Sequence, residues 1–98
     1  MTGYDIDGVL TTGKFVLSSS DVVISGRTHA EYDNTCKQLA SVCPVYIRGV
    51  GKFGDREHAG RFKAFIINML GVTTFYEDDI AQIKLIQETC PNCKVMHV

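Results

Sequence analysis

The 98-residue sequence contains no tryptophan, only two prolines and no apolar stretch as long as a membrane span. It also lacks an excess of basic residues, because its formal net charge is −1, and this argues against coating nucleic acid by bulk electrostatics. What remains is ordinary for a globular protein, with 45% hydrophobic and 21% charged residues. We expect one domain spanning residues 1–98, too small to carry a separate substrate-binding lobe.

The sequence also gives no indication of disulfide bonds or of a targeting signal. The apolar content suffices for a core, so we expect the four cysteines to remain reduced. Cys90 and Cys93 have the spacing of a zinc knuckle or redox motif, but a structural zinc site needs two more ligands, and Cys43 and His97 are poorly placed to serve. Nothing at the N-terminus reads as a secretory signal. We therefore expect a cytosolic protein with no membrane partner.

Apolar stretches that alternate with helical stripes predict an α/β protein. Five β-branched runs are typical of strands buried on both faces, at residues 3–7, 21–25, 44–48, 73–77 and 94–98. Helical spacing predicts helices at about 29–41 and 79–89, and a stripe from Phe62 to Leu70 predicts another, ended by Gly71. Such alternation forms right-handed βαβ units. We expect a three-layer α/β/α sandwich around a five-stranded, parallel, Rossmann-like sheet.

The first connection, residues 11–20, differs from the others. It is too short and too rich in serine, threonine and glycine for a covering helix, so we expect a loop or small hairpin. Phe15, Val16 and Leu17 would then fold over the mouth of the site. Exposed apolar residues in this loop could also support a dimer, although the sequence does not determine the oligomeric state.

Two acids mark the end of the first predicted strand. Asp5 and Asp7 point the same way if they lie on a strand, and Gly8 lets the chain turn just beyond them. Two crowded carboxylates repel each other unless a cation lies between them. This pattern predicts a magnesium-assisted phosphoryl-transfer site in which one carboxylate attacks and the other moves protons. The alternative is a simple strand exit, with Asp7-Gly8 as a turn pair and Asp5 solvated.

Polar residues also follow the other predicted strands. In an open parallel sheet, ligands bind beyond the carboxyl ends of the strands, so these residues should converge with the acidic pair. They are Ser25-Gly26-Arg27, the loop that starts at Gly49, and Glu77-Asp78-Asp79. Helix capping could account for one of the last three acids, but not for all of them. A hydroxyl, basic groups and three acids together suit a phosphate held with a divalent cation.

These motifs resemble those of the phosphatases in the haloacid dehalogenase-like hydrolase superfamily. The match is in the order of four motifs, which are Asp5-Ile-Asp7-Gly-Val-Leu, Ser25-Gly-Arg27, Lys63 and Glu77-Asp78-Asp79. The chain is most similar to the phosphatase domain of phage polynucleotide kinases. That likeness includes Asn34-Thr35 after the second motif, Gly54-Asp-Arg56 before the third and Gln82 after the fourth. The resemblance implies a haloacid dehalogenase-like core, here without the usual inserted cap domain.

The resemblance also implies a role for each motif residue. Asp5 would be the nucleophile that forms an aspartyl-phosphate, and Asp7 would protonate the leaving oxygen and then deprotonate the hydrolytic water. Ser25 would hydrogen-bond a phosphoryl oxygen, and Lys63 would neutralise charge on the nucleophile and the phosphate. A solvated lysine on the outer helix face is the alternative for Lys63. Mg²⁺ would be held by Asp5, by the main-chain carbonyl of Asp7, and by Asp78 or Asp79.

The missing cap leaves an open site, which suits a large substrate or the end of a polymer. Gly26, Arg27 and Arg56 are the candidate substrate-binding residues. Several basic residues at the active edge could form a rim for a polyanion, with scattered solvated charges as the alternative, and they are Lys14, Arg27, Arg48, Lys52 and Arg56. The expected partner is a nucleotide or nucleic-acid end carrying a 3′-phosphate, with a small phosphorylated molecule as the second choice.

One motif supports a function from another class. Gly49-Val-Gly-Lys-Phe-Gly54 matches a dinucleotide-binding fingerprint, follows a predicted strand, and has Glu77 roughly 20 residues further on. However, the apolar stripe begins only near Phe62, so these glycines are expected to form a loop and not a tight turn into a helix. The fingerprint also normally opens the first βα unit. A nucleotide-binding or dinucleotide-binding module without hydrolysis is therefore the alternative function.

Overall fold

A computed structural model describes residues 1–39, 42–51 and 55–98. The strands are β1 (Thr2–Tyr4), β2 (Val22–Thr28), β3 (Val45–Gly49), β4 (Thr74–Glu77) and β5 (Lys94–His97). The helices are α1 (Tyr32–Leu39), α2 (Arg56–Leu70) and α3 (Ile80–Thr89), with 3₁₀ turns η1 (Leu10–Thr12) and η2 (His29–Glu31). The predicted α/β class with five parallel strands is thereby confirmed. None of the helices in the described ranges is long and apolar enough to cross a bilayer.

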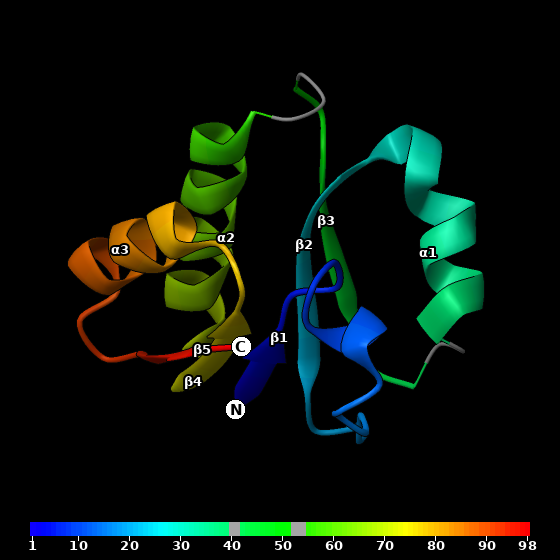
Figure 1. Ribbon diagram of the computed structural model, residues 1–98, viewed down its shortest axis with the longest axis horizontal. Helices are drawn as coiled ribbons and strands as arrows, with labels where there is room; N and C mark the ends of the chain where they lie inside the picture. Colours follow the sequence, from blue (N-terminus) through cyan, green and yellow to red (C-terminus); the bar gives the residue numbers. More distant parts are fainter. Residues whose placement is uncertain (40–41, 52–54) are drawn as a thin grey trace.

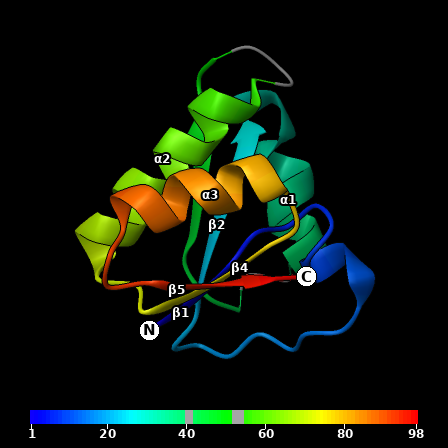
Figure 2. The ribbon, with the colours of Figure 1, turned by 60° about the vertical axis from the view of Figure 1, so that its left-hand side comes forward.

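The sheet has the strand order β3-β2-β1-β4-β5. Helix α1 lies on one side of it, and α2 and α3 lie on the other (Figure 1). Figure 2 shows α2 and α3 side by side across the same face. Because successive strands are added outward from β1 in one direction and then from β4 in the other, the order reverses between these two strands. Such a switch point is where ligands bind in open α/β sheets.

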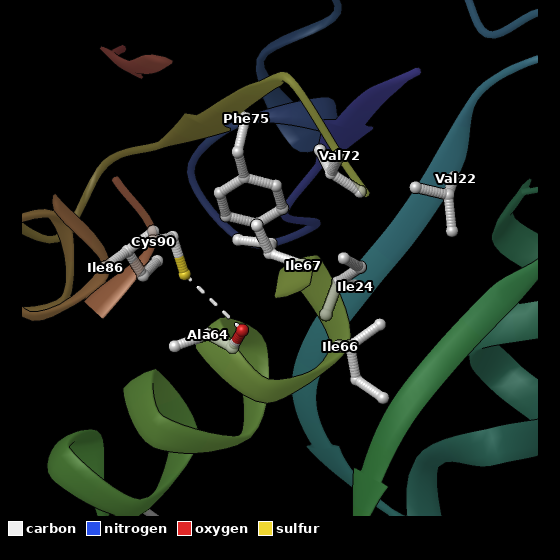
Figure 3. Packing of buried hydrophobic residues seen from close by; sticks show 9 residues of the cluster. All are labelled: Val22, Ile24, Ala64, Ile66, Ile67, Val72, Phe75, Ile86 and Cys90. Atoms are coloured by element: carbon white, nitrogen blue, oxygen red, sulfur yellow. Dashed lines mark hydrogen bonds between the residues drawn. The ribbon is translucent and has the colours of Figure 1, made fainter. Parts of the chain in front are cut away.

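The larger part of the core lies between the sheet and the helix pair α2 and α3. Phe75 of β4 and Ile67 of α2 are almost completely buried there, and Figure 3 shows them packed among the surrounding aliphatic side chains. On the opposite face, Ile6, Val23 and Leu39 form a smaller cluster beneath α1. The two clusters hold the central strands from both sides, so the loops at their carboxyl ends start from fixed positions.

Several predicted boundaries change in the structure. β1 ends at Tyr4, so Asp5 and Asp7 lie beyond the strand, whereas β2 continues to Thr28 and contains Ser25-Gly26-Arg27. The helix predicted at 29–41 starts as η2, with a capping box between Thr28 and Glu31, and continues as α1 to Leu39. Residues 40–41 of that prediction lie outside the described residues.

Helix α2 begins earlier than its apolar stripe indicates. Its first residue is Arg56, and the Asp55 side chain accepts a hydrogen bond from the His58 N–H as the N-cap. Its first turn is polar and exposed, which is why the apolar spacing did not reveal it. The predicted end is confirmed, because Gly71 adopts a left-handed conformation with φ of 71° and donates to the Ile67 carbonyl.

The first connection contains the η1 turn followed by an irregular segment, and no hairpin occurs in residues 5–21. Phe15 packs against Tyr76, with ring centroids 4.8 Å apart, and against Tyr4 at 5.4 Å. The two tyrosines come from adjacent strands and stack at 5.1 Å. Phe15 therefore covers an aromatic patch on the face of the sheet, where a crossover helix would otherwise lie.

Candidate active site at the sheet switch point

A cavity of about 730 Å³ opens at the carboxyl ends of β1, β2 and β4. Almost all of the sequence-predicted site residues line it. They are Asp5, Asp7, Gly26, Arg27, Arg56, Lys63, Asp78 and Asp79. Its volume is within the usual range for a small-molecule site and is much larger than one phosphate group requires. The switch point thus brings together residues that are up to 74 positions apart in the sequence.

A buried lysine lies at the centre of this cavity. The Lys63 ammonium is 3.2 Å from an Asp5 carboxylate oxygen, and it donates to Glu77 at 2.7 Å and to Gln82 at 2.6 Å. Asp5, Lys63 and Glu77 are each at most 5% exposed. Lys63 lies on the stripe of α2 that faces the sheet, with Ala59 one turn before it on the same face. The lysine is therefore turned toward Asp5, as the resemblance implies, and not toward solvent.

The two buried carboxylates compete for one ammonium group. Burial raises the pKa of Asp5 above its ordinary value, although Lys63 opposes this rise. Burial also raises the pKa of Glu77, and the neighbouring Asp5 raises it further. Burial disfavours the Lys63 ammonium, but attraction to Asp5 and Glu77 outweighs that effect and raises its pKa. The cluster thus holds more negative charge than Lys63 can balance.

Asp78 adds a third carboxylate to this cluster. Oxygens of Asp5, Glu77 and Asp78 lie within 4.8 Å of one another, which is close enough for one metal ion. If all three acids are ionised, Lys63 leaves them a net charge of −2. Burial and the neighbouring Glu77 raise the pKa of Asp78, although Lys63 opposes this rise. Carboxylate oxygens are the donors that Mg²⁺ prefers, so the donor set fits this ion.

The position of Asp78 depends on a glycine in the loop after β1. Gly8 has a φ of +79°, a conformation that other residues rarely adopt. A Cβ atom at this position would collide with the Asp78 carboxylate. Gly8 therefore allows the β1 loop to pass directly against Asp78, and this contact brings the first and fourth motifs together.

Glu77 has a structural role that sequence analysis did not assign. Its Oε1 accepts from the backbone N–H groups of Asp78 and Asp79, while its Oε2 accepts from Lys63. It therefore has less spare acceptor capacity for a metal than Asp5 or Asp78 has. The signal for its burial was available, because Glu77 is two residues after the buried Phe75 on the same strand and so points to the same face.

Asp79 lies at the start of α3. One of its oxygens caps the helix by accepting from the N–H groups of Ala81 and Gln82, at 3.0 and 3.2 Å. The other is 3.5 Å from Arg56. Among the described residues, the carboxylates close enough to share a metal ion include Asp78 and not Asp79. The geometry thus favours Asp78 as the metal ligand, a choice that the sequence left open.

Asp7 is not part of that carboxylate cluster and is paired with Arg27 instead. Arg27 donates to both of its carboxylate oxygens, from Nη2 at 2.7 Å and from Nε at 3.1 Å. Hydrogen bonding to Arg27 lowers the pKa of Asp7, so its carboxylate is ionised near neutral pH. The Nη1 group of Arg27 donates to Thr35 and Gln38 on α1. Sequence analysis gave neither of these two residues a role in the site.

Ser25 occupies a different position from the one expected of a phosphate ligand. It is 1% exposed, accepts a hydrogen bond from the Arg27 N–H, and is not among the described residues that line the cavity. It lies where the register between β2 and β3 shifts. Gly26, its neighbour, lines the cavity instead.

The expected basic rim is interspersed with acids. Arg48 is buried, donates to the Gly26 carbonyl at 2.9 Å and contacts His58, while Lys52 lies outside the described residues. Lys14 is not part of the described cavity lining. That lining contains seven acidic and four basic residues. The described part of the lining therefore carries more negative than positive charge, which is unlike the positive field that holds a polyanion.

One expectation about the first connection is wrong. Among the described residues, the cavity lining does not include Phe15, Val16 or Leu17, so these residues do not cover its mouth. The reason is that Phe15 packs against the tyrosines of the sheet instead. The helix after the Gly49–Gly54 motif also starts earlier than expected, because α2 begins at Arg56 and not near Phe62. Residues 52–54 of that motif lie outside the described residues.

The remaining cysteine motif shows no sign of reactivity. The Cys90 thiol is buried and donates to the Ala64 carbonyl at 3.4 Å, as Figure 3 shows. Burial, together with the neighbouring Cys90, raises the pKa of Cys93 to about 11. A thiolate, which is the form that binds metals and attacks disulfides, is thus disfavoured at Cys93.

Comparisons of the chain with models of protein families, with curated proteins and with solved structures found no match. The interpretation of the site therefore depends on its own geometry and chemistry.

The contrast between Asp78 and Asp79 generates a test. We expect Mg²⁺ to raise the melting temperature of the protein and of Asp79→Asn, because asparagine still caps a helix and Asp79 lies outside the carboxylate cluster. Asp78→Asn should abolish the rise because it removes a ligand. Thermal unfolding with and without Mg²⁺ measures both variants. A Mg²⁺ response that survives in Asp78→Asn and disappears in Asp79→Asn would reverse the assignment.

Removing Lys63 should make stability depend on pH. Lys63→Met leaves two buried carboxylates without their cation, and we expect a loss of roughly 3–5 kcal/mol at pH 8. The pKa values of Asp5 and Glu77 are raised in the folded protein, so these two acids bind protons more tightly when folded. The resulting stabilisation of the fold is present at low pH and is lost as pH rises through those pKa values. The loss should therefore be smaller at pH 5.

Denaturant unfolding in the presence of a chelator measures this difference. Lys84→Met, which changes an exposed lysine on α3, is the control and should have little effect at either pH. An equal loss at both pH values for Lys63→Met would show that lost packing, and not uncompensated charge, explains the change.

Proposed function

We propose that this chain is a magnesium-dependent phosphatase of the haloacid dehalogenase type, which hydrolyses phosphomonoesters through an aspartyl-phosphate on Asp5. One observation carries the proposal. The Asp5 carboxylate lies 3.2 Å from the buried Lys63 ammonium and within 4.8 Å of the Asp78 carboxylate, where all three line a cavity at the sheet switch point. A nucleophile, a fixed cation and a metal-binding carboxylate are the components that phosphoryl transfer requires.

The reaction has two steps at Asp5. A carboxylate oxygen of Asp5 attacks phosphorus, the bond from phosphorus to the alcohol oxygen breaks, and Asp7 gives that oxygen a proton. Water then attacks the phosphorus of the aspartyl-phosphate, Asp7 takes a proton from it, and Asp5 and inorganic phosphate are released. Asp7 must collect a proton before the first step, because Arg27 keeps it ionised, whereas its ionised form is ready to act as the base in the second step.

Lys63 serves both steps from one position. Its ammonium balances the charge of Asp5 before attack and of the phosphoryl oxygens afterwards, and it is held by Glu77 and Gln82, so little reorganisation is required. Asp5 and Asp78 would hold Mg²⁺, with the main-chain carbonyl of Asp7 assigned by resemblance. When bound, the ion supplies positive charge at the phosphoryl oxygens.

We propose a nucleotide or nucleic-acid end with a 3′-phosphate as the substrate, and a small phosphomonoester as the second choice. The size of the cavity supports a substrate larger than phosphate, because a volume of about 730 Å³ also accommodates the terminal nucleoside. Acidic residues outnumber basic ones in the described lining, and they would repel the phosphates of a long strand lying across the mouth. The charge of the lining therefore favours recognition of the terminal nucleotide alone.

The catalytic proposal predicts turnover of p-nitrophenyl phosphate that requires Mg²⁺. Asp5→Asn should abolish it, because an amide cannot form the acyl-phosphate, and a chelator should do the same reversibly. Incubation with phosphate-labelled substrate followed by acid quench should trap label on the native protein and none on Asp5→Asn. If Asp5→Asn retains turnover, or if the native protein turns over no phosphomonoester with Mg²⁺, the proposal is wrong.

The substrate proposal makes a separate prediction. Short oligonucleotides with a 3′-phosphate should have a kcat/KM at least about tenfold above that of sugar phosphates, which corresponds to about 1.4 kcal/mol of additional transition-state binding. Phosphate release from both substrates under identical conditions measures this ratio. Equal or inverted values would remove the nucleic-acid substrate and leave the phosphatase proposal intact.

A further inference from the structure

The side chain of Arg27 bridges the acid Asp7 and helix α1. Four of its five N–H groups donate to protein atoms: two to the Asp7 carboxylate, one to Thr35 at 3.1 Å and one to Gln38 at 3.0 Å. The side chain is 13% exposed, although it lines the cavity. An arginine that receives a substrate phosphate needs donors directed into the cavity, whereas this one directs most of its donors at the protein.

We propose that Arg27 is a positioning residue for Asp7, held from α1 by Thr35 and Gln38, and not a ligand of the transferred phosphate. This inference rests on the proposed phosphatase function. Asp7 lies on the loop beyond β1 with a side chain that is 66% exposed, so by itself it would sample several rotamers. The two parallel hydrogen bonds from Arg27 fix both the direction and the plane of its carboxylate.

The anchor of this bridge is itself well fixed. Thr35 is completely buried, and its hydroxyl donates to the Glu31 carbonyl at 2.8 Å while it accepts from Arg27. Glu31 in turn closes the capping box with Thr28 at the end of β2. A chain of hydrogen bonds therefore runs from the start of α1 through Arg27 to Asp7. Besides packing against the sheet, α1 would therefore help to position Asp7 for catalysis.

The proposal separates two consequences of losing Arg27. Asp7 protonates the leaving oxygen, so a misplaced Asp7 slows esters of alkyl alcohols, which leave poorly without a proton. It barely slows phosphoryl transfer from p-nitrophenyl phosphate, because p-nitrophenolate leaves without one, whereas the second step, in which Asp7 is the base, is the same for both esters. The first step alone is reported by kcat/KM, because departure of the alcohol is the first irreversible step. A phosphate ligand would instead serve both substrates equally, and its loss would raise KM for both. The ratio of the two rates thus distinguishes positioning from phosphate binding and from general loss of structure.

The experiment measures kcat and KM for p-nitrophenyl phosphate and for glycerol 2-phosphate. We expect Arg27→Gln to lower kcat/KM for the alkyl ester roughly 10²–10⁴-fold. Its kcat/KM for the aryl ester should stay within a few-fold, because that ratio does not include the second step. Thr35→Val keeps the shape but removes the hydroxyl, and should lower the alkyl rate selectively by about tenfold or more. Thr35→Ser keeps the hydroxyl and should restore it.

Controls keep folding apart from positioning. Gln38→Met changes an exposed residue and tests the same bridge if the Thr35 variants are unstable, and it too should lower the alkyl rate selectively. Arg61→Gln breaks an exposed arginine pair with Glu57 outside the cavity lining and should change neither rate. Equal losses of kcat/KM on both substrates, or no change in Arg27→Gln, would overturn the inference while the native protein still turns over both esters. A native protein that hydrolyses neither ester would overturn the phosphatase proposal, and the inference with it.

Discussion

The ion-pair cluster around Lys63 is the interaction on which the site and much of the fold depend. Its ammonium joins α2 to the end of β1 through Asp5, to the end of β4 through Glu77, and to the first turn of α3 through Gln82. Buried ion pairs are inefficient stabilisers, because the cost of removing charges from water offsets most of their attraction, and apolar residues of similar size often serve stability as well. Such an arrangement in a 98-residue domain, at the mouth of a cavity, indicates a chemical function more than a structural one.

The topology explains why the cluster can form at all. β1 and β4 are hydrogen-bonded neighbours, yet their following loops leave in different directions because the strand order reverses between them. This opening receives Asp5 from one strand and Glu77 and Asp78 from the other, and α2 brings Lys63 across it. Gly8 is the local requirement, because any side chain there would occupy the space of the Asp78 carboxylate. Elsewhere along the same edge, neighbouring loops would diverge less and leave no such crevice.

Much of this could be predicted from the sequence, and the failures have physical causes. The convergence of Asp5 and Asp78 follows from a general rule, because parallel strands end at one edge of the sheet. The inward position of Lys63 was expected only from the order of the motifs, because helical spacing misplaced the buried face of α2, whose Phe65 and Met69 are exposed. The start of α2 could not be found from apolar spacing, since its first turn is polar. The pairing of Asp7 with Arg27 depends on the paths of two loops relative to α1, which no local pattern encodes. Glu77 could have been recognised, because the alternation along β4 puts it on the same face as Phe75.

The charge balance of the cavity links the proposed cofactor to the proposed substrate. Among the described residues, its lining holds seven acids and four bases, and three of those bases, Arg27, Arg56 and Lys63, lie within 4 Å of acids of the same lining. A phosphate dianion that enters this lining meets repulsion from Asp5 and Asp78 before any reaction can begin. The Lys63 ammonium cannot offset this, because it already balances part of the charge on two carboxylates. A divalent cation between Asp5 and Asp78 would remove most of that repulsion. If the chain is the proposed phosphatase, the metal would therefore be needed for substrate to bind as well as to react.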